Sequence, residues 1–166
     1  MTDDLLAIRP WRPGDSPALL RLILPIQTAE FGLAITAAQQ PDLQDVAPYY
    51  LQGDGGFWLA LAGGEVVGCI ALKDIGDGQG ALRKLFVAAD WRGGAHGVAA
   101  RLLTTLLDHA RRRGLRDIWL GTTAQFLAAQ RFYRKHGFTD VAAEQLPVHF
   151  PRMQVDSRFF RRTIAP

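Results

Sequence analysis

The amino-acid sequence predicts a mixed α/β fold of the α+β kind, with a mostly antiparallel central sheet of six to seven strands and helices on both faces. Three observations predict it: β-rich runs joined by tight turns in the middle of the chain, two later segments with helical periodicity, and short strands between and after those helices. The chain has 166 residues, of which 48% are apolar and 21% charged, so we expect a single domain over residues 1–166.

The first part of the chain predicts a strand followed by two helices. Residues 8–11 form a short β-rich run that ends near a proline. Asp15 or Ser16 can then cap a helix whose apolar side lies within 19–26. After a loop, a second helix is expected within 41–51.

The middle of the chain predicts an antiparallel meander. Residues 57–61 and 66–72 are β-rich, and Gly63-Gly64 between them is a type I′ hairpin signal. A glycine-rich turn follows, and residues 81–87 then form a third strand.

The last part of the chain alternates helices and strands. Apolar residues recur at three-and-four spacing within 99–110, which makes one helix face, and Gly114 ends that helix. A short strand at 117–120, a helix over 124–136 and a final strand at 158–164 follow.

Composition narrows the class of protein. No apolar run approaches the length of a membrane span, and the acidic residues 1–4 do not resemble a secretory leader, so we expect a cytoplasmic protein without a membrane partner. The only cysteine, Cys69, excludes an intramolecular disulfide and a cysteine-built zinc site, and no metal is expected. The net charge of +3 fits a phosphate-bearing ligand, weak nucleic-acid contact or simply the codon bias of a GC-rich genome.

Three features in chain order carry the chemistry. The predicted strand ending at Val87 leads into a glycine-rich loop at 92–97 that opens a helix, and free backbone N–H groups there suit a pyrophosphate, although such glycines also serve ordinary turns. The next strand ends at Thr122-Thr123, where a threonine can cap the following helix. That helix carries Tyr133, which on its own fits a core residue.

Together these features resemble the GNAT superfamily of acyl-CoA-dependent N-acyltransferases. The segment Phe132-Tyr133-Arg134-Lys135-His136-Gly137-Phe138 matches the aromatic-Tyr-x-x-x-Gly-Phe ending of that family, and the loop matches its Arg/Gln-x-x-Gly-x-Gly/Ala pattern. The match covers residues 80–138, and the order of elements extends it to 8–164.

Two departures from the family pattern stand out. The loop fits either as Arg92-x-x-Ala95-x-Gly97 or with two extra residues and Gly97-Val98-Ala99 at the helix start; we prefer the second register. The family's frequent asparagine after the second strand is replaced by Phe126.

The resemblance implies acetyl-CoA as co-substrate and direct attack of an amine on the thioester. It assigns the carbonyl-polarising N–H groups to Leu85, Phe86 and Val87. The other residues expected to bind the cofactor are Arg92, Gly93, Gly94, Ala95, His96, Gly97, Val98, Ala99, Thr122 and Gln130. At least one of Arg92, Arg131, Arg134 and Lys135 is expected to contact a CoA phosphate.

The same resemblance gives the catalytic candidates. Tyr133 would protonate the leaving thiolate as general acid. Glu30 is ranked first as the base that accepts the amine proton, and His149 second.

The acceptor is expected to be a primary amine of a small molecule. Residues 28–56 carry Glu30, Asp42, Asp45 and Asp54 without Lys or Arg, which suits a cationic amine or solvated loops. An acyl-CoA sensor without catalysis and a nucleic-acid-associated module are the alternatives, although we expect no nucleic-acid partner; a homodimer is compatible with the sequence.

Overall fold

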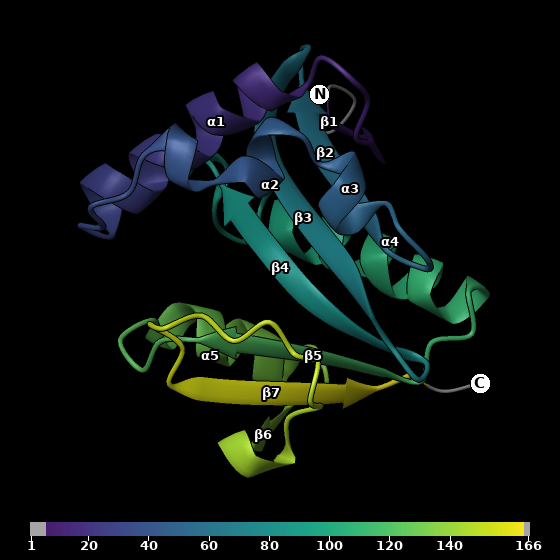
Figure 1. Ribbon diagram of the computed structural model, residues 1–166. Coiled ribbons are helices and arrows are strands. Elements are labelled where there is room, and N and C mark those ends of the chain that lie inside the picture. The colour runs from purple at the N-terminus through teal and green to yellow at the C-terminus, as the bar shows by residue number, and fades with distance from the viewer. Residues whose placement is uncertain (1–5, 165–166) are drawn as a thin grey trace.

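One seven-stranded sheet organises residues 6–164, which are the residues that the computed structural model describes. The strand order is β1-β2-β3-β4-β5-β7-β6, and all neighbouring pairs are antiparallel except β4 and β5 (Figure 1). The predicted fold class, mixed and mostly antiparallel, is therefore confirmed. The acidic residues 1–4, on which the expectation about a leader rested, lie outside the described residues.

The strands are β1 Leu6–Pro10, β2 Gly56–Ala62, β3 Glu65–Gly76, β4 Gln79–Val87, β5 Asp117–Thr122, β6 Thr139–Val141 and β7 Arg158–Thr163. The α-helices are α1 Ser16–Pro25, α2 Pro41–Gln44, α3 Ala47–Tyr50, α4 Val98–Arg112 and α5 Leu127–Lys135. A π-helical turn, η2 Ile26–Glu30, follows α1, and the 3₁₀ turns are η3 Ala37–Gln39, η4 Ala89–Trp91 and η5 Ala143–Gln145.

Alternation along the central strand β3 builds two cores, one on each face of the sheet. Ile70 and Leu72 pack with the leucines of α4 and with Tyr133 of α5. Cys69 and Ala71 point the other way and pack with α1, α2 and α3. Helices therefore cover both faces, as the sequence predicts (Figure 1).

Several local predictions are confirmed and others need correction. Gly63 and Gly64 have φ of 57° and 86°, as the hairpin turn requires. The helix expected within 41–51 is two short helices, α2 and α3. Residue 30 lies in η2 rather than in a loop.

The helix expected from residue 124 begins only at Leu127, with Phe126 as its N-cap rather than a threonine. The buried Gln130 side chain explains the delay, because it donates to the carbonyls of Thr123 and Ala124 and holds them in a turn. Ser157 N–H bonds to Thr122 O and anchors the same turn to the approach to β7.

Strands β4 and β5 share only a short stretch of pairing, and this shapes the molecule. Their parallel register runs from Gln79 opposite Asp117 to Ala81 opposite Trp119. Beyond that point the two strands diverge toward their C-terminal ends, which leaves an opening between the two halves of the sheet (Figure 1). Within residues 6–164, no helix has both the length and the apolar character needed to cross a membrane.

We expect Gly55→Ala to destabilise the fold. A Cβ at Gly55 would collide with the Tyr50 carbonyl oxygen and lie 2.7 Å from that of Leu72, and backbone atoms cannot move aside cheaply. The free energy of unfolding should fall by about 1–3 kcal/mol, measured by denaturant titration. Gly94→Ala is the control, because no atom lies within 4 Å of the added carbon, and its change should stay within about 0.5 kcal/mol. Equal stability of the two variants would contradict the packing argument.

Candidate functional site

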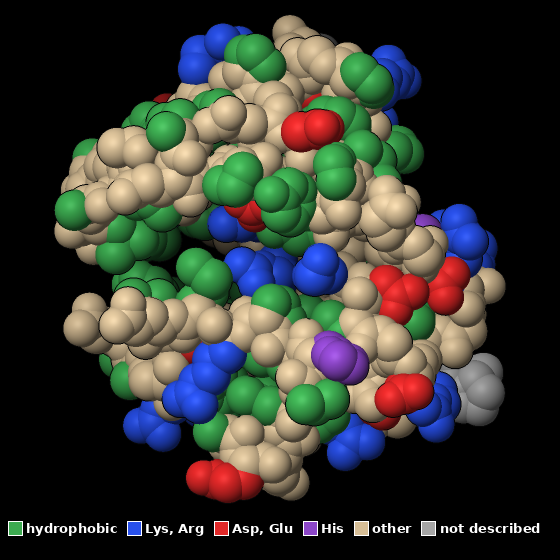
Figure 2. Space-filling model, in the orientation of Figure 1, with side chains coloured by type: hydrophobic (Ala, Val, Ile, Leu, Met, Phe, Trp, Pro, Cys, Tyr) green, Lys and Arg blue, Asp and Glu red, His purple; other side chains and the backbone are tan. Residues whose placement is uncertain are grey.

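A cavity of about 780 Å³ lies where β4 and β5 diverge. Residues of β4 from Leu82 to Val87 form one wall, and the end of β5 with the start of α5 forms the other. Figure 2 shows a hollow between the two halves of the molecule, bordered by hydrophobic side chains with Lys and Arg side chains beside it. The volume is that of a site for a small molecule or cofactor.

A β-bulge in β4 determines which side chains face this cavity. Cys69 pairs with Phe86 and Ala71 with Arg83, so the two residues between them on β4 oppose one on β3. Lys84, in the bulge, has a left-handed φ of 58°, a strain of about 1–3 kcal/mol for a residue other than glycine. Arg83 and Lys84 both line the cavity, as do the other residues of β4 from Leu82 to Val87.

The glycine-rich loop ends as an open helix N-terminus. Gly97 is the N-cap of α4, with φ 59° and ψ 29°, and the first bond of the helix runs from Arg101 N–H to Gly97 O at 2.9 Å. The N–H groups of Val98, Ala99 and residue 100 therefore have no partner within the helix. This placement agrees with the register in which Gly97-Val98-Ala99 opens the helix.

Arg92 joins this loop to η2 and alters the role expected of Glu30. The guanidinium of Arg92 makes two bonds to the Glu30 carboxylate, at 2.6 and 3.0 Å, and Nε donates to Val87 O. The hydrogen bonds from Arg92 lower the pKa of Glu30, and Glu30 does not line the cavity. Both facts argue against Glu30 as the proton acceptor, and its role as the base stays a prediction.

The second wall differs in part from expectation. Thr122 lines the cavity, and so does Thr123, whose buried hydroxyl has no hydrogen-bond partner among the described residues. Gln130 was expected to bind the cofactor, but its amide is occupied by backbone carbonyls of the preceding turn and does not line the cavity. A ligand could therefore satisfy Thr123 but not Gln130.

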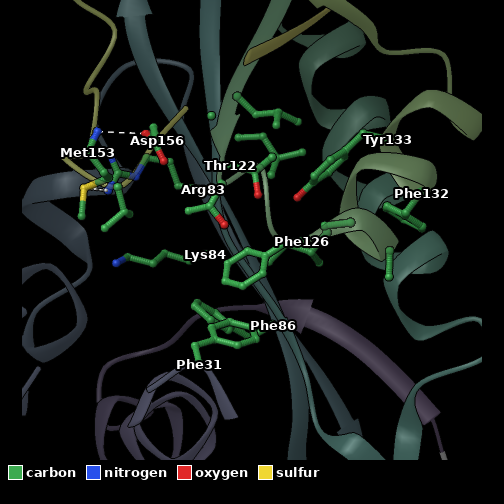
Figure 3. A pocket seen from close by; sticks show the side chains of 18 of the residues that line it. Phe31, Arg83, Lys84, Phe86, Thr122, Phe126, Phe132, Tyr133, Met153 and Asp156 are labelled. Carbon is green, nitrogen blue, oxygen red and sulfur yellow. Dashed lines mark hydrogen bonds between the residues drawn. The ribbon is translucent and has the colours of Figure 1, made fainter. Parts of the chain in front are cut away.

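Tyr133 lies in the wall of the cavity, with its hydroxyl pointing inward (Figure 3). Its ring packs edge-on against Phe132 and Phe138, and no hydrogen bond to its hydroxyl occurs within the described residues. Burial raises the pKa of Tyr133, so the phenol holds its proton at neutral pH. The Tyr133 phenol therefore faces the cavity in its protonated form.

Asp156 is a cavity residue that the sequence analysis missed. It lies near Arg83 and Met153, across the view from Tyr133 (Figure 3), and its Oδ2 accepts the Met153 N–H at 2.9 Å. It packs against Gly121, where a Cβ would be 2.7 Å from Oδ2. Burial raises the pKa of Asp156, and no cation lies within 4 Å of it among the described residues. It lies in the connection that follows η5, separated from β7 by one residue, and no local sequence pattern marks it.

The remaining predicted residues are distributed as follows. His149, the second candidate base, is exposed and does not line the cavity. Among the expected phosphate contacts, Arg134 is held by Asp140 at 2.7 Å, while Arg131 and Lys135 are exposed on α5. The predicted site residues that line the cavity are Leu85, Phe86, Val87, Arg92, Ala99, Thr122 and Tyr133; residues 93–98 lie between Arg92 and Ala99 outside that lining.

Known proteins resemble this chain in sequence and fold. The acetyltransferase (GNAT) family matches residues 20–138. N-acetyltransferase family 8 member 2 of Rattus norvegicus is 33% identical over 124 residues, 72% of this chain and 53% of that protein. N-acetylaspartate synthetase of Xenopus tropicalis is 34% identical over 109 residues, 64% of this chain and 40% of that protein. An acetyltransferase of the GNAT family from Staphylococcus aureus Mu50 has a TM-score of 0.90 and 32% identity, over 96% of this chain and 99% of that chain.

The chain spans about half the length of the curated relatives it matches. It covers nearly all of the solved bacterial structure. The region of similarity includes the diverging strands, the loop and Tyr133.

We expect Gly97→Val to weaken acetyl-CoA binding by about tenfold to a hundredfold, the value of one or two lost bonds to an anion. Gly97 has a left-handed φ of 59° that valine adopts poorly, so the helix N-terminus should shift. Calorimetric titration measures the affinity. Gly114→Val is the matched control, because Gly114 has a φ of 77° at the other end of the same helix. If both variants bind acetyl-CoA equally, the helix start is not the phosphate site.

Proposed function

The chain belongs to the acetyltransferase (GNAT) family, and we propose that it transfers the acetyl group of acetyl-CoA to a primary amine of a small-molecule acceptor. One observation carries the proposal: the free edge of β4, the start of α4 and the Tyr133 hydroxyl border one cavity. The names of the relatives, an N-acetyltransferase and an N-acetylaspartate synthetase, support transfer to nitrogen.

The residues at the cavity fit acetyl-CoA. The unpaired N–H groups of α4 suit the pyrophosphate, since a helix N-terminus attracts anions. The edge of β4 beyond Ala81 offers backbone groups to the amide-rich pantetheine, as β5 no longer pairs with it. The unsatisfied Thr123 hydroxyl supplies a further polar contact in the opposite wall.

Two parts of the chain would act on the thioester. A backbone N–H from the segment Leu85, Phe86 and Val87 would donate to the carbonyl oxygen as negative charge develops there. The Tyr133 hydroxyl would give its proton to the sulfur as the carbon–sulfur bond breaks. Its raised pKa keeps that proton available at neutral pH.

Asp156 would accept the proton that the amine loses as its nitrogen bonds to the carbonyl carbon. A carboxylate is a stronger base when burial raises its pKa, and Asp156 is the cavity carboxylate in which this occurs. Acid and base then lie on different sides of the cavity, which separates the leaving sulfur from the incoming nitrogen. Solvent exchange restores both groups after turnover.

The non-catalytic alternatives receive less support. Binding acyl-CoA without catalysis does not require a protonated phenol in the cavity wall, whereas acetyl transfer does use one. In the basic run at the end of α4, Arg111 pairs with Asp108 and Arg113 with Asp54, which reduces its attraction for a nucleic acid.

We expect Tyr133→Phe to lower kcat by about 10²-fold while acetyl-CoA affinity and fold are retained, because only the hydroxyl is removed. The loss should lie near the low end for general acids, since a thiolate is a good leaving group. CoA release over an amine panel gives the rate. Tyr49→Phe, at an exposed tyrosine outside the cavity lining, is the control. A wild-type kcat in Tyr133→Phe would return Tyr133 to a purely structural role.

We expect Asp156→Asn to lower kcat/KM by about 10²–10⁴-fold at pH 8. The ratio of wild-type to variant kcat/KM should shrink as pH falls through the pKa of Asp156, because both proteins then lack a carboxylate. That pKa is raised by burial, so the ratio should begin to fall at a higher pH than for an ordinary aspartate.

Asp45→Asn, at an exposed carboxylate outside the cavity lining, serves as the control for this pH series. A wild-type to Asp156→Asn ratio that does not vary with pH would show that Asp156 holds the site in shape but takes no proton.

A further inference from the structure

We propose that the acceptor amine also carries a carboxylate, as an amino acid does, and that Arg83 and Lys84 bind this carboxylate while Asp156 faces the amine. The inference rests on the proposed acetyl transfer and adds the chemical class of the acceptor.

The charges that line the cavity support it. They are Arg83, Lys84, Arg92 and Asp156. Arg92 lies by the α4 loop and donates two hydrogen bonds to Glu30, whereas Lys84 makes a single longer contact with Asp42, at 3.4 Å. The part of the cavity away from that loop therefore presents two cations, Arg83 and Lys84, and one carboxylate, Asp156. Such a set of charges is complementary to a molecule that carries an ammonium group and one or two carboxylates.

The Arg83 guanidinium has N–H donors that are not used within the described residues. One of its terminal nitrogens donates to Pro151 O at 3.0 Å and the other lies 3.3 Å from Met153 Sδ. No carboxylate lies within 4 Å of Arg83 among the described residues. A guanidinium has five N–H donors in a planar fork, so this anchored side chain can still take a carboxylate.

Lys84 is held in place by Asp42, which can accept only some of the hydrogen bonds that the ammonium can donate. Its Nζ lies 3.4 Å from Asp42 Oδ2, and its side chain is only 11% exposed. The same Asp42 oxygen accepts the Tyr50 hydroxyl at 2.6 Å. Because an ammonium carries three donors, Asp42 and Tyr50 can orient Lys84 from behind while another N–H faces the cavity.

The bulge places both cations in the cavity, and it does so through a strained residue. The left-handed φ of Lys84 is one that glycine would adopt without cost. We take a lysine in this costly conformation as support for a role of its ammonium in the cavity. The Cys69 thiol, at 3.2 Å from Lys84 O, helps to hold the bulge.

Met153 shows that the two charge types are neighbours. Asp156 accepts the Met153 backbone N–H, and Arg83 contacts the Met153 sulfur (Figure 3). An α-amino acid also carries its ammonium and its carboxylate close together, as two substituents of the same α-carbon. One small molecule can therefore reach both groups at once.

The acidic character of residues 28–56, which suggested a purely cationic acceptor, does not reach the cavity. Glu30 pairs with Arg92, Asp42 with Lys84 and Asp54 with Arg113. Neutralised carboxylates exert little attraction on an incoming amine. The cationic amine stays a prediction, and we add to it a carboxylate on the same acceptor.

The test compares three acceptor series at saturating acetyl-CoA: the L-amino acids, their amides, and the matching amines without the carboxyl carbon. CoA release should be fastest with an amino acid, with kcat/KM at least tenfold above its amide. The amine of the amide is less basic than that of the amino acid, so a larger fraction of the amide is neutral and reactive. This difference favours the amide, and a faster reaction of the amino acid therefore reflects recognition of its carboxylate. Faster release from the amides or simple amines would overturn the inference and leave acetyl transfer standing. Release from none of the three series would count against both.

Variants of Lys84 locate the effect. Lys84→Met should raise KM for the preferred amino acid by about tenfold to a hundredfold, with less than a threefold change for its amide, and Lys84→Arg should restore most of the affinity. Lys73→Met is the control, because Lys73 lies on β3 outside the cavity lining.

Lys84→Gly guards against a folding artefact, since glycine keeps the φ of the bulge without strain. It relieves the strain while losing the ion pair with Asp42, so a folded Lys84→Gly protein, checked by its thermal transition, should still show the raised KM. An equal effect of Lys84→Gly on amino acid and amide would overturn the role of Lys84 in carboxylate binding.

Discussion

The early end of pairing between β4 and β5 is the constraint on which the site depends. After Ala81 opposite Trp119 the strands diverge, so the edge of β4 loses its neighbour while β5 keeps β7 on its other side. A sheet normally satisfies its backbone groups by pairing, and an internal edge without a partner is costly unless a ligand supplies one. The same divergence opens the cavity and directs β4 toward the glycine-rich loop and α4. Cofactor groove, thioester position and acceptor space thus follow from one interrupted ladder.

The bulge in β4 refines this arrangement. It reverses the alternation of side chains at one point of the strand. Leu82 therefore packs in the core on the α4 side, and Phe86 packs against the core on the α1 side. The two cations between them, Arg83 and Lys84, line the cavity. The strain at Lys84 is offset by local partners: the ion pair with Asp42, the Tyr50 hydroxyl on that carboxylate, and the Cys69 thiol on the Lys84 carbonyl. A stable core on both sides holds a backbone conformation that is unfavourable in isolation.

The parts of the fold that the sequence predicts well are those with local causes. The leucine periodicity of α4 and the Gly63-Gly64 hairpin are examples, because the residues that determine them are neighbours in the chain. The base that we propose, Asp156, could not be found in this way. Asp156 is placed by Gly121 and Met153, and Glu30 is withdrawn by Arg92 across 62 positions. The bulge could not be predicted from the sequence either, because lysine is not a residue type that favours a left-handed φ. Gln130 was misplaced for a similar reason: its bonds close a turn whose position depends on β7.

Glu30 and Asp156 show why the charge of a segment is a poor guide to the charge of a site. Both are carboxylates in segments that border the cavity region, yet a guanidinium lowers the pKa of Glu30 while burial raises that of Asp156. Pairing makes a carboxylate inert as a base and removes its field from the surroundings; burial without a close cation does the opposite. The same reasoning applies to the cations. Arg92 is cancelled by Glu30, whereas Arg83 keeps unpaired donors beside Asp156. Arg83 and Asp156 are the lining charges without an ion-pair partner among the described residues, and Lys84 adds a cation with one contact, to Asp42. These are the charges to which we assign the orientation of an amine and a carboxylate on the same acceptor.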